Sequence, residues 1–147
     1  MPDITAQQLT EYLYAHRIKP TAMRLLVLRQ LMEAEQTLTL RQLEEALAPA
    51  DRSTIFRTLS LFVQQHAAHV VVDGSGATRY EICHGHHTDD DDDRHPHFRC
   101  LHCGRTICLT GQRMPSITLP DGFISQHVNY VITGLCSDCS GQSTHDN

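Results

Sequence analysis

Four of the six cysteines form two matched Cys-x-x-Cys pairs, and these are the residues of the chain best suited to chemistry. The pairs are Cys100 with Cys103 and Cys136 with Cys139, and 32 residues separate them. Two such pairs in one small domain are typical of a tetrahedral zinc site with four sulfur ligands. The alternative is two disulfide bonds, which form in exported proteins. The spacing therefore predicts a structural zinc ion that folds the C-terminal half.

A second group of potential metal ligands lies upstream of the first pair. His95 and His97 are two residues apart, so on a strand they project from the same face. Cys83 follows a predicted hairpin and His69 precedes it. These sulfur and nitrogen donors suit Zn2+ better than Mg2+ or Ca2+, and they predict a second metal site. The alternative is that Cys83 is a small buried hydrophobic residue and His69 an ordinary histidine.

The segment between these ligands is rich in histidine and aspartate. His84, His86 and His87 follow Cys83, and the acidic run Asp89–Asp93 comes next. One interpretation is a solvated loop whose charges repel one another. The other is a loop that gathers metal ions weakly, as histidine-rich tracts do.

Length and charge set the broad class of the protein. A chain of 147 residues makes one domain or two small ones. We find no apolar run that could cross a bilayer and no signal peptide, so we expect a cytoplasmic protein with no membrane partner. Residues 1–66 carry seven Lys/Arg and seven Asp/Glu, and residues 67–147 carry five and ten, which gives the net charge of −5. This balance argues weakly against a nucleic-acid partner but leaves room for a local basic face.

The elements that must position these ligands are short helices followed by a hairpin. Apolar residues at helical spacing predict four helices in residues 9–63, and Thr21, Thr39 and either Asp51 or Ser53 are suited to begin the last three. Two strands, Val70 to Val72 and Thr78 to Ile82, enclose a turn with two glycines. This outline indicates a winged helix-turn-helix, and the alternative is a helical domain that carries a hairpin.

The second half is predicted to form short strands between the cysteine pairs. Residues 107–109 indicate one strand, and residues 123–132 indicate a longer one that leads to the second pair. We expect a DNA-binding domain in residues 1–82 and a His/Asp-rich hinge loop in residues 83–95. A dimerisation domain in residues 96–141 and a disordered tail in residues 142–147 complete the expected organisation.

Four segments together carry a resemblance to a known family. They are Thr21-Ala22-Met23-Arg24 at a helix opening, Ser53-Thr54-Ile55-Phe56-Arg57-Thr58-Leu59 in the fourth helix, Arg79-Tyr80-Glu81 in the hairpin, and the His-x-His-x-x-Cys-x-x-Cys-Gly run from His95 to Gly104. With the final Gly-x-Cys-x-x-Cys, they resemble the ferric uptake regulator family of bacterial metal-dependent repressors. The resemblance implies an α+β fold, with an N-terminal winged helix-turn-helix followed by a small α/β dimerisation domain that holds the structural four-cysteine zinc site. It also implies a homodimer that binds double-stranded operator DNA of inverted-repeat symmetry.

Within this family the chain is similar to the zinc uptake regulators. The resemblance places His69, Cys83, His95 and His97 at the regulatory ligand positions of those proteins, so each chain is expected to hold one structural and one regulatory Zn2+. Iron- and peroxide-responsive members place a histidine just before the third helix, and that position is Thr37 here. Cys108 stands where many members have glutamate, and it is either a further ligand or a buried strand residue.

The fourth helix is expected to read the DNA. We expect Thr54, Phe56 and Arg57 to contact bases, with Phe56 touching a thymine methyl group. Arg24 and Arg52 are expected to contact phosphates. For Arg57 the alternative is an ion pair on the helix surface.

Other classes of protein fit the sequence less well. A zinc deaminase needs a His-x-Glu motif upstream of its cysteine pair, and this chain has none. A site with four cysteine ligands is closed to water, so we expect no enzyme and no small-molecule substrate. An electron carrier with iron in the same site leaves the helical half unexplained. The remaining alternatives are an iron- or peroxide-responsive regulator of the same family and a zinc storage or delivery protein that does not bind DNA.

Overall fold

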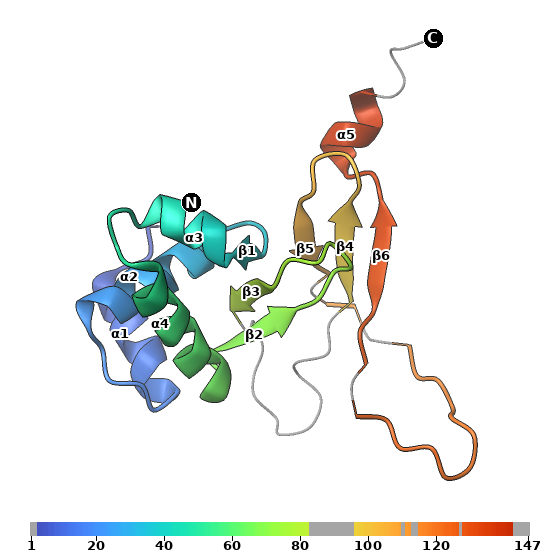
Figure 1. Cartoon of the computed structure of the whole chain (residues 1–147), viewed down its shortest axis with the longest axis horizontal. Helices are drawn as coiled ribbons and strands as arrows, with labels where there is room; N and C mark the ends of the chain where they lie inside the picture. The colour runs from blue at the N-terminus through green and yellow to red at the C-terminus, as the bar shows by residue number, and fades with distance from the viewer. Residues whose placement is uncertain (1–2, 83–95, 110, 113–114, 127, 143–147) are drawn as a thin grey trace. The chain divides into compact units, whose positions relative to one another are not determined.

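The computed structural model describes residues 3–82, 96–109, 111–112, 115–126 and 128–142 (Figure 1). The chain divides into two compact units, Met1–Cys83 and His84–Asn147. Cys83 and His95 lie outside the described residues, as does the acidic run between them. Within the part that is described, no helix is both long and apolar enough to cross a membrane.

The first unit contains four helices, and the last three start where their predicted capping residues place them. Thr21 accepts a hydrogen bond from the backbone N–H of Arg24, and Thr39 forms a reciprocal capping box with Gln42. Asp51 caps the fourth helix by position, without a side-chain capping bond. These caps satisfy backbone donors that a helix leaves unpaired at its first turn. The helices are α1 (Ala6–Ala15), α2 (Ala22–Glu33), α3 (Leu40–Ala46) and α4 (Arg52–Gln64).

A small antiparallel sheet completes the first unit and supplies the predicted wing. Strands β2 (Ala68–Val71) and β3 (Arg79–Ile82) form the hairpin, and β1 (Leu38–Thr39) pairs with the other edge of β3. In the hairpin register His69 lies directly opposite Glu81. The hairpin follows the helices in the order of a winged helix-turn-helix, which confirms the predicted fold of this half.

The turn of this hairpin is held by a buried ion pair. Oδ1 of Asp73 accepts a hydrogen bond from the N–H of Ser75 at 2.9 Å, and Oδ2 lies 2.7 Å from Nε of Arg79. The Nε–H group is not aligned for a hydrogen bond, so the contact with Arg79 is an ion pair. Gly74 and Gly76 take positive φ angles of 83° and 86°, which only glycine adopts without strain. These contacts fix the turn between the two strands.

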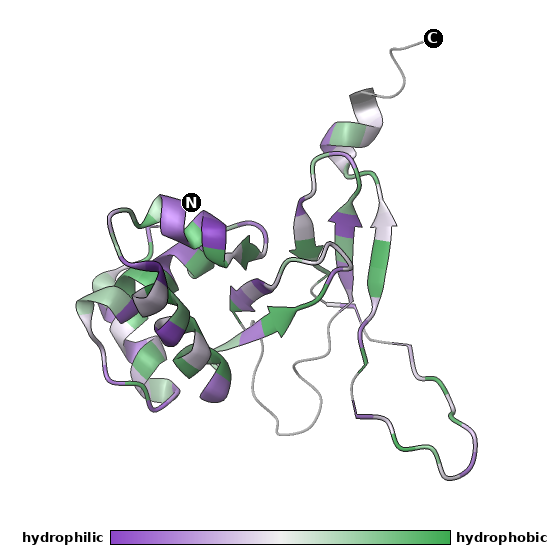
Figure 2. Cartoon of the chain, in the orientation of Figure 1, coloured by the Kyte–Doolittle hydropathy of each residue, from purple (hydrophilic) through white to green (hydrophobic). Residues whose placement is uncertain are grey.

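One hydrophobic core holds the helices of the first unit against the sheet. Figure 2 shows green hydrophobic residues alternating with purple hydrophilic ones along the helices, as expected for amphipathic helices with one buried face. On α4, Ile55, Leu59 and Phe62 are fully buried, and they recur at helical spacing. The other large buried side chains of this core are Leu9, Leu13, Ile18, Val27, Leu28, Leu31, Leu43, Tyr80 and Ile82.

The second unit contains a three-stranded sheet and a short helix. Strands β4 (His97–Cys100), β5 (Thr106–Cys108) and β6 (Val131–Gly134) lie in the order β5-β4-β6, and helix α5 spans Ser137–Gln142. β5 runs antiparallel to β4, whereas β6 runs parallel to it with Cys100 opposite Gly134. These small sheets and helices confirm the predicted α+β class.

One prediction for the second unit is wrong. The strand predicted for residues 123–132 forms only at its end, because β6 begins at Val131 and the described residues between 123 and 130 form no strand. Their apolar side chains are exposed rather than paired, with Phe123 at 67% and Ile124 at 86% exposure. Helix α5 spans Ser137–Gln142, and the rest of the predicted tail, residues 143–147, lies outside the described residues.

Candidate metal centres and DNA-binding surface

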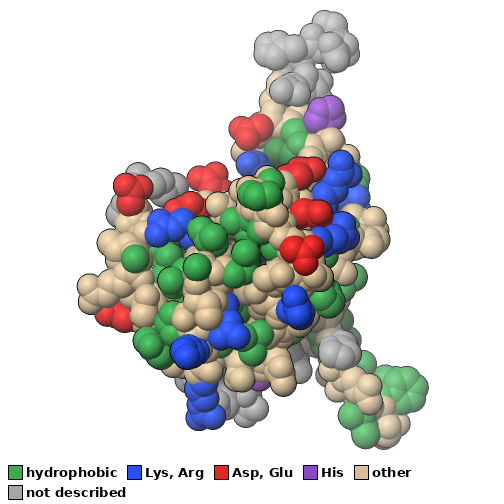
Figure 3. All heavy atoms as spheres, turned by 60° about the vertical axis from the view of Figure 1, so that its left-hand side comes forward, with side chains coloured by type: hydrophobic (Ala, Val, Ile, Leu, Met, Phe, Trp, Pro, Cys, Tyr) green, Lys and Arg blue, Asp and Glu red, His purple; other side chains and the backbone are tan. Residues whose placement is uncertain are grey.

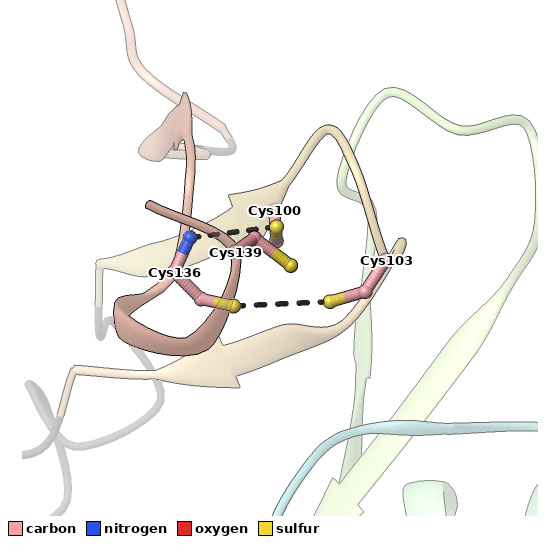
Figure 4. A group of neighbouring side chains, drawn as sticks. All are labelled: Cys100, Cys103, Cys136 and Cys139. Atoms are coloured by element: carbon pink, nitrogen blue, oxygen red, sulfur yellow. Dashed lines mark hydrogen bonds between the residues drawn. The ribbon is translucent and has the colours of Figure 1, made fainter. Parts of the chain in front are cut away.

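The two cysteine pairs come together in the second unit. The Sγ atoms of Cys100, Cys103, Cys136 and Cys139 all lie within 4.8 Å of one another, and Figure 4 shows the four side chains converging. Cys100, Cys136 and Cys139 are at most 9% exposed, and Cys103 lies at the surface. All four are free cysteines, so the described structure contains the cluster that the spacing predicted rather than two disulfide bonds.

The strand topology explains why these pairs meet. Cys100 ends β4, and Cys136 follows β6 after one intervening residue. Because β4 and β6 are parallel neighbours, their C-terminal ends lie side by side. The N–H of Leu101 donates to the carbonyl of Gly134 at 2.8 Å, which continues the pairing as far as the cysteines.

The thiols of Cys100 and Cys139 have pKa values shifted in opposite directions. Hydrogen bonds from the backbone N–H groups of Cys103 and Cys136 lower the pKa of Cys100 to about 5. The neighbouring sulfur of Cys136, together with burial, raises the pKa of Cys139 to about 12. Crowded thiolates repel one another, so all four ionise together only when a cation is bound among them. Four sulfur donors of this kind are the ligand set of a structural zinc site, and the cluster fits such an ion.

His69 is the only one of the four predicted regulatory ligands that lies in the described part of the first unit. It lies on β2, and its Nε2 is 2.5 Å from Oε1 of Glu81 on β3. Glu81 is only 8% exposed, although a strand carboxylate is usually solvated. The sequence alone does not predict the pairing of Glu81 with His69, because this contact depends on the hairpin register rather than on nearness in sequence. A histidine and a carboxylate side by side are a pair of potential metal ligands.

The other predicted ligands are distributed differently. His97 begins β4 in the second unit and lies directly opposite Cys108 on β5. Cys108 is half-buried on that strand. Cys83 and His95 fall outside the described residues, so the structure does not place them.

Helix α4 presents the predicted base-reading residues in the first unit. Phe56 is 49% exposed, and Arg57 beside it is exposed, whereas Thr54 is half-buried. An apolar ring of this size at a helix surface is available to a partner. Figure 3 shows Lys and Arg side chains set among hydrophobic ones on the forward face, without one continuous basic patch. The mixture agrees with the balanced charge of this half.

The two arginines predicted to contact phosphates already have partners within the unit. Nη1 of Arg24 donates to the backbone carbonyl of Lys19 at 2.8 Å. Arg52 on α4 forms an ion pair of 3.3 Å with Glu44 on α3. Both contacts are at the surface, where an ion pair contributes little and can be exchanged for another anion.

Comparison with known proteins supports the fold. A zinc uptake regulator complexed with zinc and DNA matches with a TM-score of 0.66 at 20% identity, over 94% of each chain. The Helicobacter pylori ferric uptake regulator matches with a TM-score of 0.59 at 18% identity, over 94% of this chain and 95% of that one. A zinc-bound manganese uptake regulator matches with a TM-score of 0.59 at 20% identity, over 87% of this chain and 98% of that one.

These three likenesses establish the fold, and no curated protein matches the chain. The model of the ferric uptake regulator family matches residues 15–118, which include helices α2 to α4, the wing hairpin and the first cysteine pair. Members of that family are metal-dependent transcription regulators and not enzymes. The chain therefore belongs to the ferric uptake regulator family.

Proposed function

We propose that the protein is a cytoplasmic, zinc-responsive repressor that binds inverted-repeat operator DNA as a homodimer when its regulatory metal site is filled. The observation that carries this proposal is the position of His69. This potential ligand lies on the wing hairpin, within the same unit as the exposed face of α4. A metal bound through the hairpin therefore acts on the unit that contacts DNA, so that metal and DNA binding are linked.

The proposed regulatory ligands are His69, Cys83, His95 and His97, and each chain would hold one zinc ion there in addition to the structural one. We add Glu81 to this proposal. Its carboxylate contacts the His69 ring at 2.5 Å. A carboxylate in this position either binds the metal directly or accepts a hydrogen bond from the ring and so orients the histidine.

The donor set favours zinc over iron. Cys83 would supply a thiolate and the histidines imidazole nitrogens, and this mixture is typical of zinc sites. Thr37, at the position where iron-responsive relatives are expected to place a histidine, is fully buried and supplies no nitrogen ligand. The resulting set differs from the oxygen-rich sites expected for iron.

The apolar surface of the second unit supports a homodimer. Ile117, Phe123 and Ile124 are each more than 65% exposed on the segment that precedes β6. Large apolar side chains gathered on one segment are usually covered by a partner. We propose that a second copy of the chain covers them, which would place two copies of α4 against the two halves of an inverted repeat.

On DNA we propose that Phe56, Arg57 and Thr54 contact bases, with Arg24 and Arg52 on phosphates. Arg57 can donate two hydrogen bonds to guanine, and Phe56 can pack on a thymine methyl group. The ion pair of Arg52 with Glu44 would then open in favour of a phosphate.

The decisive experiment measures DNA affinity against buffered free zinc, with Fe2+ and Mn2+ in parallel. The DNA is selected from a random pool by the zinc-loaded protein. We expect zinc to tighten binding far more than the other metals. In Cys83→Ser we expect the zinc response to be lost and the zinc content to fall from two ions per chain to one.

Cys108→Ser is the matched control, because it removes the other thiol outside the two pairs while leaving the proposed regulatory set intact. We expect this variant to keep the zinc response. DNA binding that ignores every metal would refute the sensor, whereas a protein that binds zinc but selects no DNA would favour zinc storage. An unchanged zinc response in Cys83→Ser would refute the ligand set. In the wild type, DNA binding that Fe2+ tightens more than zinc does would indicate an iron regulator.

A further inference from the structure

Helix α1 ends in a turn that favours glycine, and Arg17 occupies the glycine position. Its N–H donates to the carbonyl of Tyr14 at 3.0 Å, and the N–H of Ile18 donates to that of Leu13 at 2.9 Å. These two bonds define a common helix-ending motif in which the residue at this position is left-handed. Arg17 has a φ angle of 60°, where the β-carbon of any residue other than glycine is crowded. The arginine is therefore kept at a cost in stability.

The described structure gives this side chain no internal partner. Arg17 is exposed, and within the described part of the chain its guanidinium forms neither an ion pair nor a hydrogen bond. A residue held in a disfavoured conformation without an internal contact points to a role outside the fold. The helix dipole also favours a cation at the C-terminal end of a helix, and this electrostatic effect is the alternative explanation.

The charge of the surrounding surface indicates the kind of partner. Residues 12–32 contain four Lys or Arg and no Asp or Glu, and residues 52–72, which include α4, contain two Arg and again no acidic residue. The two stretches hold six of the seven cations of residues 1–66, whereas all seven acidic residues lie outside them. Helix α2, in the first stretch, packs against both α1 and α4 (Figure 1). Positive charge concentrated on neighbouring elements in this way suits a polyanion.

We propose that Arg17 contacts a DNA phosphate and so extends the DNA-binding surface from α4 to the turn between α1 and α2. The inference rests on the proposal that the protein binds operator DNA. Arg24, already proposed to contact phosphate, lies over the same turn, because its guanidinium bonds to the carbonyl of Lys19 at 2.8 Å. A guanidinium binds phosphate through strong charge-assisted hydrogen bonds, whatever the DNA sequence. The chain thus keeps a destabilising residue for its contact with DNA.

The test follows stability and DNA binding together, because Arg17→Gly changes them in opposite directions. Glycine relieves the crowding, so we expect the Tm of the full-length zinc-loaded protein, followed by circular dichroism, to rise by roughly 4 °C. The same variant removes one cation from each protomer of the dimer. Each lost phosphate contact lowers the slope of log affinity against log salt concentration by about 0.9, so we expect the slope to fall by about 2.

Affinity is measured by fluorescence anisotropy between roughly 50 and 200 mM salt. One probe is the DNA that the zinc-loaded wild type selects from a random pool, and the other is a scrambled DNA of equal length. We expect Arg17→Gly to weaken binding to both by about tenfold, because a phosphate contact carries no sequence information. Arg17→Gln, which keeps the crowding, should lose the same affinity with a wild-type Tm. Arg17→Lys keeps the charge and should keep the salt slope.

His66 provides a matched control, because it ends α4 in the same motif. The N–H groups of His66 and Ala67 donate to the carbonyls of Val63 and Phe62 at 3.1 and 2.8 Å, and His66 has a φ angle of 59°. We expect His66→Gly to raise the Tm as well but to leave the salt slope unchanged. Arg41→Gln controls for net charge at a site that is 83% exposed, and it should also keep the wild-type slope.

Three results would count against the proposal. An unchanged salt slope in Arg17→Gly, with DNA binding intact, would overturn the contact of Arg17 alone. A lower Tm in that variant would also overturn it, since the arginine would then be retained for the helix dipole. Wild-type protein that selects no DNA from the pool would refute the proposed repressor and the phosphate contact together.

Discussion

The ion pair between Asp73 and Arg79 gives the most direct test of what holds the wing. The carboxylate of Asp73 is fully buried, and Arg79 is 12% exposed. Asp73→Asn keeps an oxygen that can accept from the N–H of Ser75 but removes the negative charge that lies 2.7 Å from Nε of Arg79. Removing one partner of a buried pair costs about 3–5 kcal/mol. Because Arg79 keeps some contact with water, we expect the lower end, about 3 kcal/mol.

Urea unfolding followed by circular dichroism at the helical band measures this cost, because α1 to α4 all lie in the first unit and dominate the signal. For a unit of this size, 3 kcal/mol corresponds to a fall in Tm of roughly 12–24 °C. The double variant Asp73→Asn/Arg79→Gln should lose less than the sum of the two single losses, by about 1–3 kcal/mol. Losses that add would show that the two side chains act independently and would refute the ion pair as the element that holds the turn.

Three further predictions concern the core, the DNA surface and the metal. Phe62→Ala removes a fully buried ring and should lower the free energy of unfolding by about 3–5 kcal/mol in the same assay; a loss below about 1 kcal/mol would contradict this packing. Arg57→Ala should weaken binding to the selected DNA by about 1–3 kcal/mol, measured by fluorescence anisotropy, with unchanged circular dichroism. Cys136→Ser should abolish the tightly held zinc, measured by metal analysis, while the first unit keeps its helical signal. Acid should also lower the zinc content of the wild type, because protons compete with zinc for the sulfur atoms and the bound zinc is lost as the pH falls.

Features set by nearby residues could be predicted from the sequence. Thr21 and Thr39 cap their helices because the capping bond spans only three residues. The four cysteines could be identified as one cluster because the chemistry of zinc requires four ligands. The family resemblance, the winged helix and the fold class, which also follow from short motifs and the order of elements, are confirmed.

Features set by distant residues could not be predicted. Strand β1 is only two residues long and exists through its pairing with β3. The contact of Glu81 with His69 depends on the register of the hairpin, which the alternation of side chains alone leaves open. Phe123, Ile124 and Val128 match a strand pattern but lie on no strand in the described structure, so the pattern alone predicted too long a strand.

The parallel pairing of β4 with β6 has a consequence for the order in which the protein is assembled. The strands are far apart in sequence, and a loop must close before Cys100 and Gly134 can meet. A metal ion that binds both cysteine pairs cross-links this loop. A cross-link over that length reduces the conformational entropy of the unfolded chain, which stabilises the folded state by about 4 kcal/mol. The first unit has its own core and needs no such aid. Newly made chains would therefore fold the first unit early and complete the second sheet only when zinc binds both cysteine pairs. A chelator that removes the metal could then separate β4 from β6 without breaking a covalent bond.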